Sequence, residues 1–308
     1  MASALLSDDP LVRLQTANSV WADASCRIKP EYNALLKKSF HAESFEVPLM
    51  TSEQAPRVNN WVKDKTQGMI PQLIDTLRGS LMVLVNTVYF KGRWAESFDP
   101  SLTRDHSFQT AEGNSVQCRM MRQSGRFDYA EGSDWQAVRL PYGSGRHAMV
   151  VFLPVLRKNE SPRSGLNRLV GSLSPAHWHD WISAMKPMQG TVQMPRFKVR
   201  YGTKDMVEVF KSLGVAKAFQ NDAEFSPMAT APLMISKILH QAVIDNKEEG
   251  TEASAATAIS LLGAGRGVVS EREFSLVLDR PFLCVIKDSL SGTWLFAGLI
   301  KDPSAHAD

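Results

Sequence analysis

The feature that most constrains this chain is a run of very small side chains that follows a short acidic turn. Residues 248–258 read Glu-Glu-Gly-Thr-Glu-Ala-Ser-Ala-Ala-Thr-Ala. Small side chains can enter a crowded β-sheet between existing strands, where larger side chains would collide. In such a strand one face would carry Thr251, Ala253, Ala255 and Thr257, and the other Glu252, Ser254, Ala256 and Ala258. The run therefore predicts a segment that can become a new strand of a sheet.

A helix is the alternative interpretation of this run, because alanine has the highest helix propensity and glutamate suits a first helical turn. The residues that follow argue against it. Gly263, Gly265 and Gly267 lie close together and disfavour a stable helix, and they indicate an exposed tip that proteases can reach. Residues 274–286 are then apolar, β-branched and typical of a strand. We therefore expect an exposed loop that leads into a strand.

Several blocks of the sequence resemble the serpin family of serine protease inhibitors. Residues 250–257 are similar to the hinge of inhibitory serpins, and residues 276–286, which contain Asp-Arg-Pro-Phe, match the family's C-terminal signature. Residues 86–94, followed by Phe98, Thr103 and Phe108, resemble the central strand and the breach region. Residues 60–68 resemble the end of helix F and the turn after it. The resemblance runs from about Leu14 to Pro303, which is nearly the whole chain.

The resemblance implies an α+β fold. In it a large central mixed sheet A is accompanied by further sheets B and C, by surrounding helices and by an exposed reactive-centre loop, here residues 248–273. No linker or break in composition divides the chain, so we expect residues 1–308 to form a single domain. Compared with the family pattern the chain has almost nothing before Leu14, and we expect it to lack the N-terminal helices of a full-length serpin.

The activity that the resemblance implies is suicide inhibition of serine, or alternatively cysteine, endopeptidases. The protease cleaves the loop, the loop inserts into sheet A, and the acyl-enzyme is trapped. The hinge would comprise Glu248, Glu249, Gly250, Thr251, Glu252, Ala253, Ser254, Ala255, Ala256 and Thr257. In the family the residues that match Asn86 and His240 bond to each other at the shutter, beneath the strands that part. Trp94 matches the breach tryptophan, where insertion begins.

The scissile bond has two candidates. Counting from the hinge as in typical serpins gives Ala264-Gly265, which suits an elastase-like protease with a small pocket. Arg266-Gly267, two residues later, suits a trypsin-like protease, and an exposed arginine flanked by glycines is an attractive substrate. The stretch between Gly267 and the C-terminal signature is longer than in many serpins, so both bonds stay open.

Other classes of protein find less support in the residues. The turn at Gly143-Ser144-Gly145 lacks the surroundings of a hydrolase nucleophile elbow, so we expect no enzyme. His177 and His179 are two residues apart on an expected helix and would not share a face, so we expect no metal site, and no motif indicates a cofactor. The competing hypothesis is a non-inhibitory or inactive truncated serpin-fold protein, which would be a protease substrate or a binding module.

Composition bounds the partners and the compartment. The net charge of +3 is mild and its basic residues are scattered, so we expect no nucleic acid partner. No apolar stretch has membrane-spanning length, so we expect no membrane partner, and we expect a monomer. Cys26, Cys118 and Cys284 form no disulfide or zinc pattern. The first residues do not resemble a signal peptide, which leaves the location open: extracellular if the true N-terminus is missing, and otherwise cytoplasmic.

The remaining patterns predict a mixed α/β chain. Strands are expected at 13–21, 79–90, 191–199, 274–288 and 293–301, and several more between 115 and 153. The long apolar run at 79–90 predicts a strand that is buried on both faces. Helices are expected at 29–39, at 55–65, after the N-cap Ser174, and at 203–213 with Gly214 ending the helix.

Overall fold

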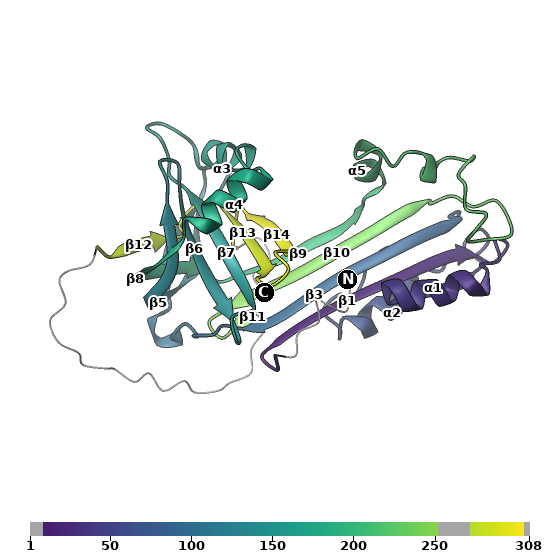
Figure 1. The fold of residues 1–308 in the computed structure, drawn as a ribbon, viewed down its shortest axis with the longest axis horizontal. Helices are drawn as coiled ribbons and strands as arrows, with labels where there is room; N and C mark the ends of the chain where they lie inside the picture. Colours follow the sequence, from purple (N-terminus) through teal and green to yellow (C-terminus); the bar gives the residue numbers. More distant parts are fainter. Residues whose placement is uncertain (1–8, 252–271, 305–308) are drawn as a thin grey trace. The chain divides into compact units, whose positions relative to one another are not determined.

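The computed structural model describes residues 9–251 and 272–304, and strands dominate in them (Figure 1). A first mixed sheet has the strand order β2-β1-β3-β11-β10-β9. Its strands are β1 (Val12–Asp23), β2 (Ala42–Val47), β3 (Met82–Arg93), β9 (Phe197–Asp205), β10 (Lys237–Lys247) and β11 (Gly250–Thr251). β3 and β10 are parallel to each other, and the two-residue strand β11 is antiparallel to both.

A second sheet has the order β12-β8-β5-β6-β7-β13-β14, and β4 pairs with β5 at its side. Its strands are β4 (Arg104–Gln109), β5 (Ser115–Glu131), β6 (Trp135–Tyr142), β7 (His147–Pro154), β8 (Lys186–Pro195), β12 (Phe274–Val277), β13 (Phe282–Asp288) and β14 (Trp294–Ile300). β5 is 17 residues long and pairs with β4, β8 and β6. In the described residues the expected sheets B and C are therefore joined through β5.

Helices are short by comparison. They are α1 (Pro30–Phe40), α2 (Ala55–Lys65), α3 (Pro162–Gly171), α4 (Pro175–Ser183) and α5 (Val207–Ser212), with 3₁₀ turns at Pro100–Leu102 and Lys217–Phe219. α2 has the predicted bounds, and the Ser174 hydroxyl caps α4 as expected, by accepting a hydrogen bond from the amide of His177. Within the described parts of the chain, none of these helices is long and apolar enough to cross a bilayer.

The described residues fall into two compact units whose segments alternate along the chain. Unit 1 contains residues 14–90 and 199–244. Unit 2 contains residues 9–13, 91–198, 245–251 and 272–304. Organisation as a single domain stays a prediction.

One face of the sheet in unit 1 packs against α2. Val58 and Val62 are one helical turn apart, and they share a buried cluster with Val83 and Val85 of β3 and with Leu239 of β10. Burying each such aliphatic side chain stabilises the fold by about 1.5–3 kcal/mol. The cluster fixes which residues of β3 and β10 point away from α2, because successive strand residues alternate between faces.

β3 fits the prediction of burial on both faces only in part. Residues 83, 85, 87 and 89 are buried, whereas 84, 86 and 88 are half-buried. The apolar residues of the run predicted that both faces of the strand are covered, but α2 covers only one of them. On the other face, Met82 and Phe90 are buried as expected, whereas residues 84, 86 and 88 between them are half-buried and more accessible than expected.

Two predicted elements near residue 200 are wrong in their bounds. The single strand expected at 191–199 is the end of β8 and the start of β9, and the chain changes strand at Arg196. Pro195 has no amide to donate and ends β8, while the amide of Arg196 donates to the carbonyl of Arg119 at 2.8 Å. The helix expected at 203–213 is only α5, since β9 continues to Asp205. Gly214 follows with φ +93°, as its predicted role at the helix end requires.

Candidate functional site

Two residues of the predicted hinge, Gly250 and Thr251, form a strand between β3 and β10. The register of β11 pairs Gly250 with Arg93 and Lys247, and Thr251 with Gly92 and Asn246. Elsewhere β3 and β10 pair directly with each other, over residues 83–89 and 237–243. β11 therefore separates two strands that are otherwise neighbours.

Gly250 is the residue at which the chain enters the sheet, and no other residue type fits there. Its φ is +129°, a conformation that residues with a side chain rarely adopt. A Cβ atom at this position would collide with the carbonyl oxygen of Gly92, and it would lie 2.6 Å from Cα of Arg93 and 2.8 Å from the amide nitrogen of Trp94. All three are backbone atoms, which cannot swing aside as a side chain can.

Glu248 anchors the chain just before this entry. Its side chain is buried, and both carboxylate oxygens accept a hydrogen bond from Nε of Arg196 at 2.8 Å. An Nη2 of the same arginine lies 2.6 Å from Oε1, and the hydroxyl of Thr103 donates to Oε1 at 2.6 Å. Burial alone would raise the pKa of Glu248, but the hydrogen bonds from Arg196 and Thr103 outweigh it and hold the pKa below its ordinary value. The carboxylate is therefore charged at neutral pH.

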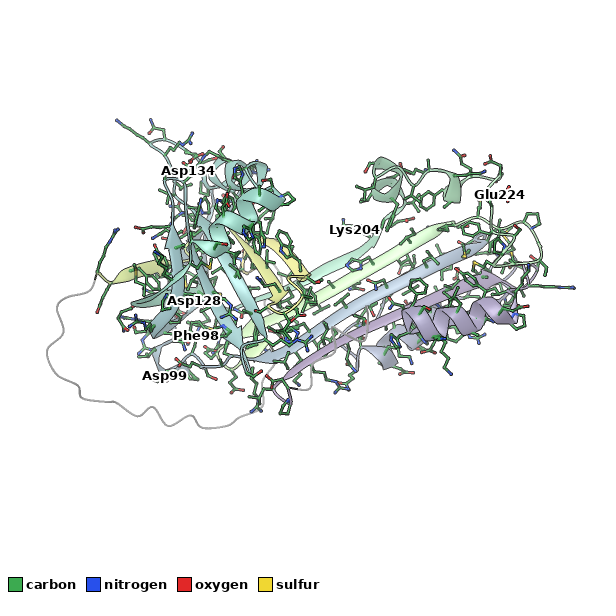
Figure 2. The ribbon with its side chains drawn as sticks, in the orientation of Figure 1. Phe98, Asp99, Asp128, Asp134, Lys204 and Glu224 are labelled. Carbon is green, nitrogen blue, oxygen red and sulfur yellow. The ribbon has the colours of Figure 1, made fainter. Side chains whose placement is uncertain are left out.

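Trp94 holds the backbone on either side of Glu248. Its indole Nε1 donates to the carbonyl of Lys247 at 3.0 Å, and its amide donates to the carbonyl of Glu249 at 3.1 Å. The ring stacks on Tyr142 with centroids 4.2 Å apart, and it meets the edge of Phe98, labelled in Figure 2, at 6.0 Å. The predicted breach residue thus holds the start of the hinge in place by bonding to main-chain carbonyls of residues 247 and 249.

Asn86 and His240 lie in unit 1, directly opposite each other in the register of β3 and β10. Nδ1 of His240 is 2.7 Å from Oδ1 of Asn86, and Nδ2 of Asn86 donates to Oδ1 of Asn18 at 2.6 Å. Because Oδ1 of Asn86 can only accept, Nδ1 of His240 carries the proton. Nδ2 of Asn18 donates in turn to the carbonyl of Phe40 at 3.3 Å. A chain of hydrogen bonds therefore crosses β10, β3 and β1.

Burial lowers the pKa of His240, because desolvation disfavours the charged imidazole. The ring is neutral at pH 7 with Nδ1 protonated, which is the form that the bond to Asn86 requires. Protonation of Nε2 would add a charge to this face of the sheet.

Three residues of these clusters were missed by sequence reasoning. Asn18 lies inside an expected strand, as Asn86 does, and a polar amide in such a position needs a hydrogen-bond partner. This could have indicated Asn18 as well. Arg196 stood in a stretch expected to be a continuous strand, and Thr103 was quoted only as part of a resemblance. The pairing of Arg196 and Thr103 with Glu248 follows from tertiary structure, since 52 and 145 residues separate them from it.

Several predicted residues lie outside the described residues. They are the rest of the hinge, Glu252, Ala253, Ser254, Ala255, Ala256 and Thr257, and the scissile candidates Ala264, Gly265, Arg266 and Gly267. Among the residues that are described, no three His, Cys, Asp or Glu side chains are grouped so that they could hold a metal ion.

Comparison with known proteins agrees with this fold and with the sequence blocks. The family model described as serpin (serine protease inhibitor) matches residues 1–303. The chain belongs to the serpin family.

Relatives and solved structures of the family match most of the chain. Serpin-Z10 of Arabidopsis thaliana is 33% identical, over 96% of this chain and 78% of its own length. The leukocyte elastase inhibitor of Bos taurus is also 33% identical, over 94% of this chain and 78% of its own length. The native, stressed structure of Arabidopsis AtSerpin1 matches with a TM-score of 0.83 and 29% identity, covering 98% of this chain and 80% of that one. The α+β serpin fold is thereby established for this chain.

Proposed function

We propose that this protein is a single-use inhibitor of a serine endopeptidase. The protease would cleave the loop after β11, and the freed segment would extend β11 between β3 and β10 while the acyl-enzyme is still attached. The supporting observation is β11 itself, a two-residue strand paired on both sides with strands that are otherwise neighbours. The inhibitory name of the bovine relative agrees with this function.

The register of β11 specifies where an inserted loop would lie. Six residues on from Thr251 is Thr257, and six residues back along β3 and β10 are Asn86 and His240. If β11 is extended without a bulge, Thr257 stands between these two residues and on their face of the sheet, because directly opposed residues share a face. Insertion must therefore break the 2.7 Å bond between His240 and Asn86. This is the shutter role that we propose for the pair.

Strand direction favours the inserted state. β3 and β10 are parallel where they pair directly, and β11 is antiparallel to both. Insertion thus exchanges one parallel ladder for two antiparallel ladders, and antiparallel pairing is slightly more stable per residue. The net gain is one extra ladder. About a dozen inserted residues, at about 0.5–1.5 kcal/mol per hydrogen bond, would contribute roughly ten kcal/mol. That is comparable to the stability of a whole domain.

The test has two measurements on the full chain. Incubation with trypsin and with elastase should give an SDS-stable complex with one of them, and sequencing of the released fragment identifies the bond. Cleavage after Arg266 indicates a trypsin-like target, and cleavage after Ala264 an elastase-like target. The melting temperature should rise strongly once the loop is cut. Cleavage without a complex and without a rise in melting temperature would instead identify a non-inhibitory protein of the same fold.

Two arginine variants locate the inserting half of the loop. Thr251→Arg places a long charged side chain at the start of the insertion strand, and we expect cleavage without a stable complex. Ser270→Arg introduces the same side chain on the other side of every scissile candidate, so it should leave complex formation intact. Equal complex formation by both variants would contradict the hinge assignment.

A further inference from the structure

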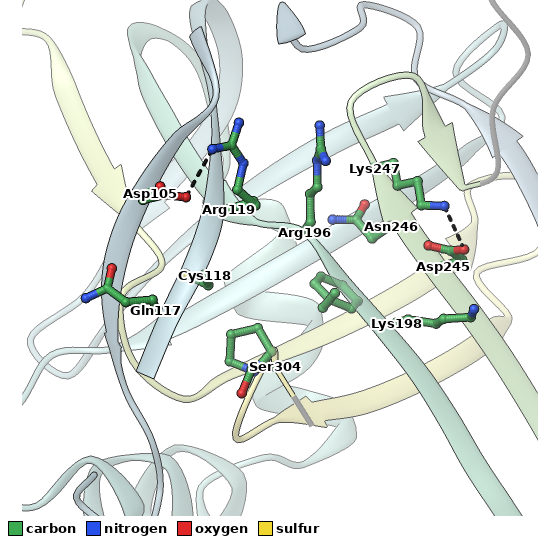
Figure 3. Close-up of a pocket in the computed structure, with 12 residues that line it drawn as sticks. Asp105, Gln117, Cys118, Arg119, Arg196, Lys198, Asp245, Asn246, Lys247 and Ser304 are labelled. Carbon is green, nitrogen blue, oxygen red and sulfur yellow. Dashed lines mark hydrogen bonds and ion pairs between the residues drawn. The ribbon is translucent and has the colours of Figure 1, made fainter. Parts of the chain in front are cut away.

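Both ends of the loop are attached to β8 of unit 2. β12, which follows the loop, pairs in parallel with β8. Arg196, the first residue after β8, binds Glu248, which stands just before β11. Asn246, which lines the same cavity as Arg196 in Figure 3, donates from Nδ2 to the carbonyl of Pro195 at 3.4 Å and so ties the end of β8 to β10. One strand therefore fixes where the loop leaves the first sheet and where it joins the second.

Phe274, the first residue of β12, is held by aromatic contacts that lie beyond β8. Its ring is buried and stacks on Tyr129 of β5, with centroids 4.0 Å apart and 8° between the ring planes. The ring also meets Phe127 of the same strand edge-on, at a centroid distance of 6.0 Å. Because β8 lies between β12 and β5, the ring must reach across β8. Such aromatic pairs stabilise the attachment of β12 beyond the burial of the ring itself.

Gly190 makes this reach possible. It is the residue of β8 directly opposite Phe274, and a Cβ atom there would collide with Cδ1 and Cε1 of the ring and lie 2.6 Å from Cγ. Cγ stands at the base of the ring, so a small rotation of the side chain could not relieve the conflict. The backbone of Gly190 is not left-handed, so the ring, and not the φ angle, requires the glycine.

The Tyr129 ring is itself fixed by hydrogen bonds. Its hydroxyl donates to Oε2 of Glu131 at 2.7 Å and accepts from Nε2 of Gln136 at 2.8 Å. Oε1 of Glu131 accepts from Nη2 of Arg272, just after the loop, at 2.8 Å. The Arg272 side chain is 81% exposed, so this ion pair contributes little. Among the described strands β12 pairs with β8 alone, and the attachment of β12 therefore depends on Phe274.

The attachment of β12 limits what an uncut loop can do. About a dozen inserted residues, from residue 252 to 263, would advance about 40 Å along β3 and β10, at about 3.3 Å per residue. The ten residues that remain before Phe274 must reverse direction and return, and they span at most about 36 Å when fully extended. The inserted strand would run along β3 into unit 1, whereas β12 belongs to unit 2. An uncut loop can therefore insert fully only if β12 leaves β8, and a cut loop needs no such release.

We propose that the Phe274 cluster, formed by Phe274, Tyr129, Phe127 and Gly190, makes insertion of the loop depend on its cleavage. While the ring is stacked, β12 stays on β8 and keeps the uncut loop out of the first sheet. A protease cut separates the inserting residues from β12, so insertion then proceeds with the cluster intact. The proposal rests on the inhibitory function proposed above, and it assigns a positioning role to residues on the far side of every scissile candidate.

The test follows the uncut protein over time. Gly190→Ala and Phe274→Leu should each loosen β12, so amides of residues 274–278 should exchange at least roughly tenfold faster in hydrogen exchange followed by mass spectrometry. Both variants should also convert, with unchanged intact mass, to a form that trypsin and elastase no longer cut in the loop and that melts at a higher temperature. This conversion should be at least roughly fivefold faster than in the unaltered protein, because the aromatic pairing is lost. A merely structural role would lower the melting temperature without producing this form.

Gly125→Ala is the matched control. Gly125 of β5 is directly opposite Gly190, but a Cβ there meets no atom closer than 3.8 Å, so exchange and conversion should be unchanged. If Gly190→Ala does not fold, Phe274→Leu decides, because it keeps an apolar side chain and removes only the ring.

Cutting the loop of the unaltered protein distinguishes the two proposals. No rise in melting temperature on cutting would refute insertion, and the role of the Phe274 cluster with it. A rise on cutting, together with equal conversion rates in the unaltered protein and all folded variants, would overturn the role of the cluster alone.

Discussion

Replacing Gly250 by alanine should expel the start of the hinge from the sheet. The new Cβ would collide with the backbone oxygen of Gly92 and lie 2.6 Å from Cα of Arg93. Keeping φ at +129° with a side chain costs about 1–3 kcal/mol by itself. Leaving the sheet instead forfeits a few hydrogen bonds of β11, at about 0.5–1.5 kcal/mol each. Because the steric collision adds to the cost of staying, we expect the residue to leave the sheet, and the loss of these hydrogen bonds should weaken the pairing of β11 by about 2–4 kcal/mol.

Hydrogen exchange followed by mass spectrometry measures this weakening directly. Amides in peptides that cover residues 90–94 and 245–251 should exchange at least tenfold faster in Gly250→Ala, since about 1.4 kcal/mol corresponds to a factor of ten. Gly171→Ala is the matched control, because a Cβ at Gly171 of α3 meets nothing within 4 Å. Unchanged exchange in Gly250→Ala would refute the reasoning, since the steric conflict is with backbone and has no side chain to relieve it.

Three further predictions concern the anchors and the histidine. Arg196→Met leaves the buried Glu248 carboxylate with Thr103 as its remaining side-chain donor, and it should lower the free energy of unfolding by about 2–4 kcal/mol. Arg119→Met removes one partner of an exposed ion pair and should change the free energy of unfolding by less than about 1 kcal/mol. Urea denaturation measures both values. Trp94→Phe removes the donor to the Lys247 carbonyl and should lower the free energy of unfolding by about 1–3 kcal/mol in the same assay. Trp181→Phe is the control and should lower it less, because the indole of Trp181 makes no hydrogen bond to the described residues. NMR titration should find the pKa of His240 below 6.5. Near that pKa the unfolded chain binds more protons than the folded protein, so His240 should make the protein less stable as the pH falls through 6.5. A pKa above 6.5 would contradict the buried, neutral ring.

Much of the local structure could be predicted because its causes are local. The Ser174-Pro175 pair predicted the start of α4, and the spacing of Val58 and Val62 fits the face that α2 buries. The strand break at Arg196 was missed although Pro195 was an available signal. The middle of the second face of β3 was misjudged because an apolar run does not tell whether another element covers it.

The candidate site was predictable only through the resemblance. Asn86 and His240 are 154 residues apart, and nothing in their spacing indicates that parallel pairing brings them to 2.7 Å. The same holds for Arg196 and Glu248. Gly250 is different, because a glycine at the start of a small-residue run signals an unusual backbone angle before any fold is known.

The hydrogen bonds of Trp94 to the main chain predict which substitutions the protein tolerates at residues 247–250. Both of its hydrogen bonds to this segment end on carbonyl oxygens, those of Lys247 and Glu249, which every amino acid possesses. Position 248, in contrast, needs a carboxylate for the side chain of Arg196, and position 250 needs a glycine because the neighbouring backbone excludes a Cβ atom. In a randomised library of positions 247–250, diversity should therefore survive at the first and third positions. It should vanish at the second position, where Arg196 requires a carboxylate, and at the fourth, where the neighbouring backbone excludes a side chain.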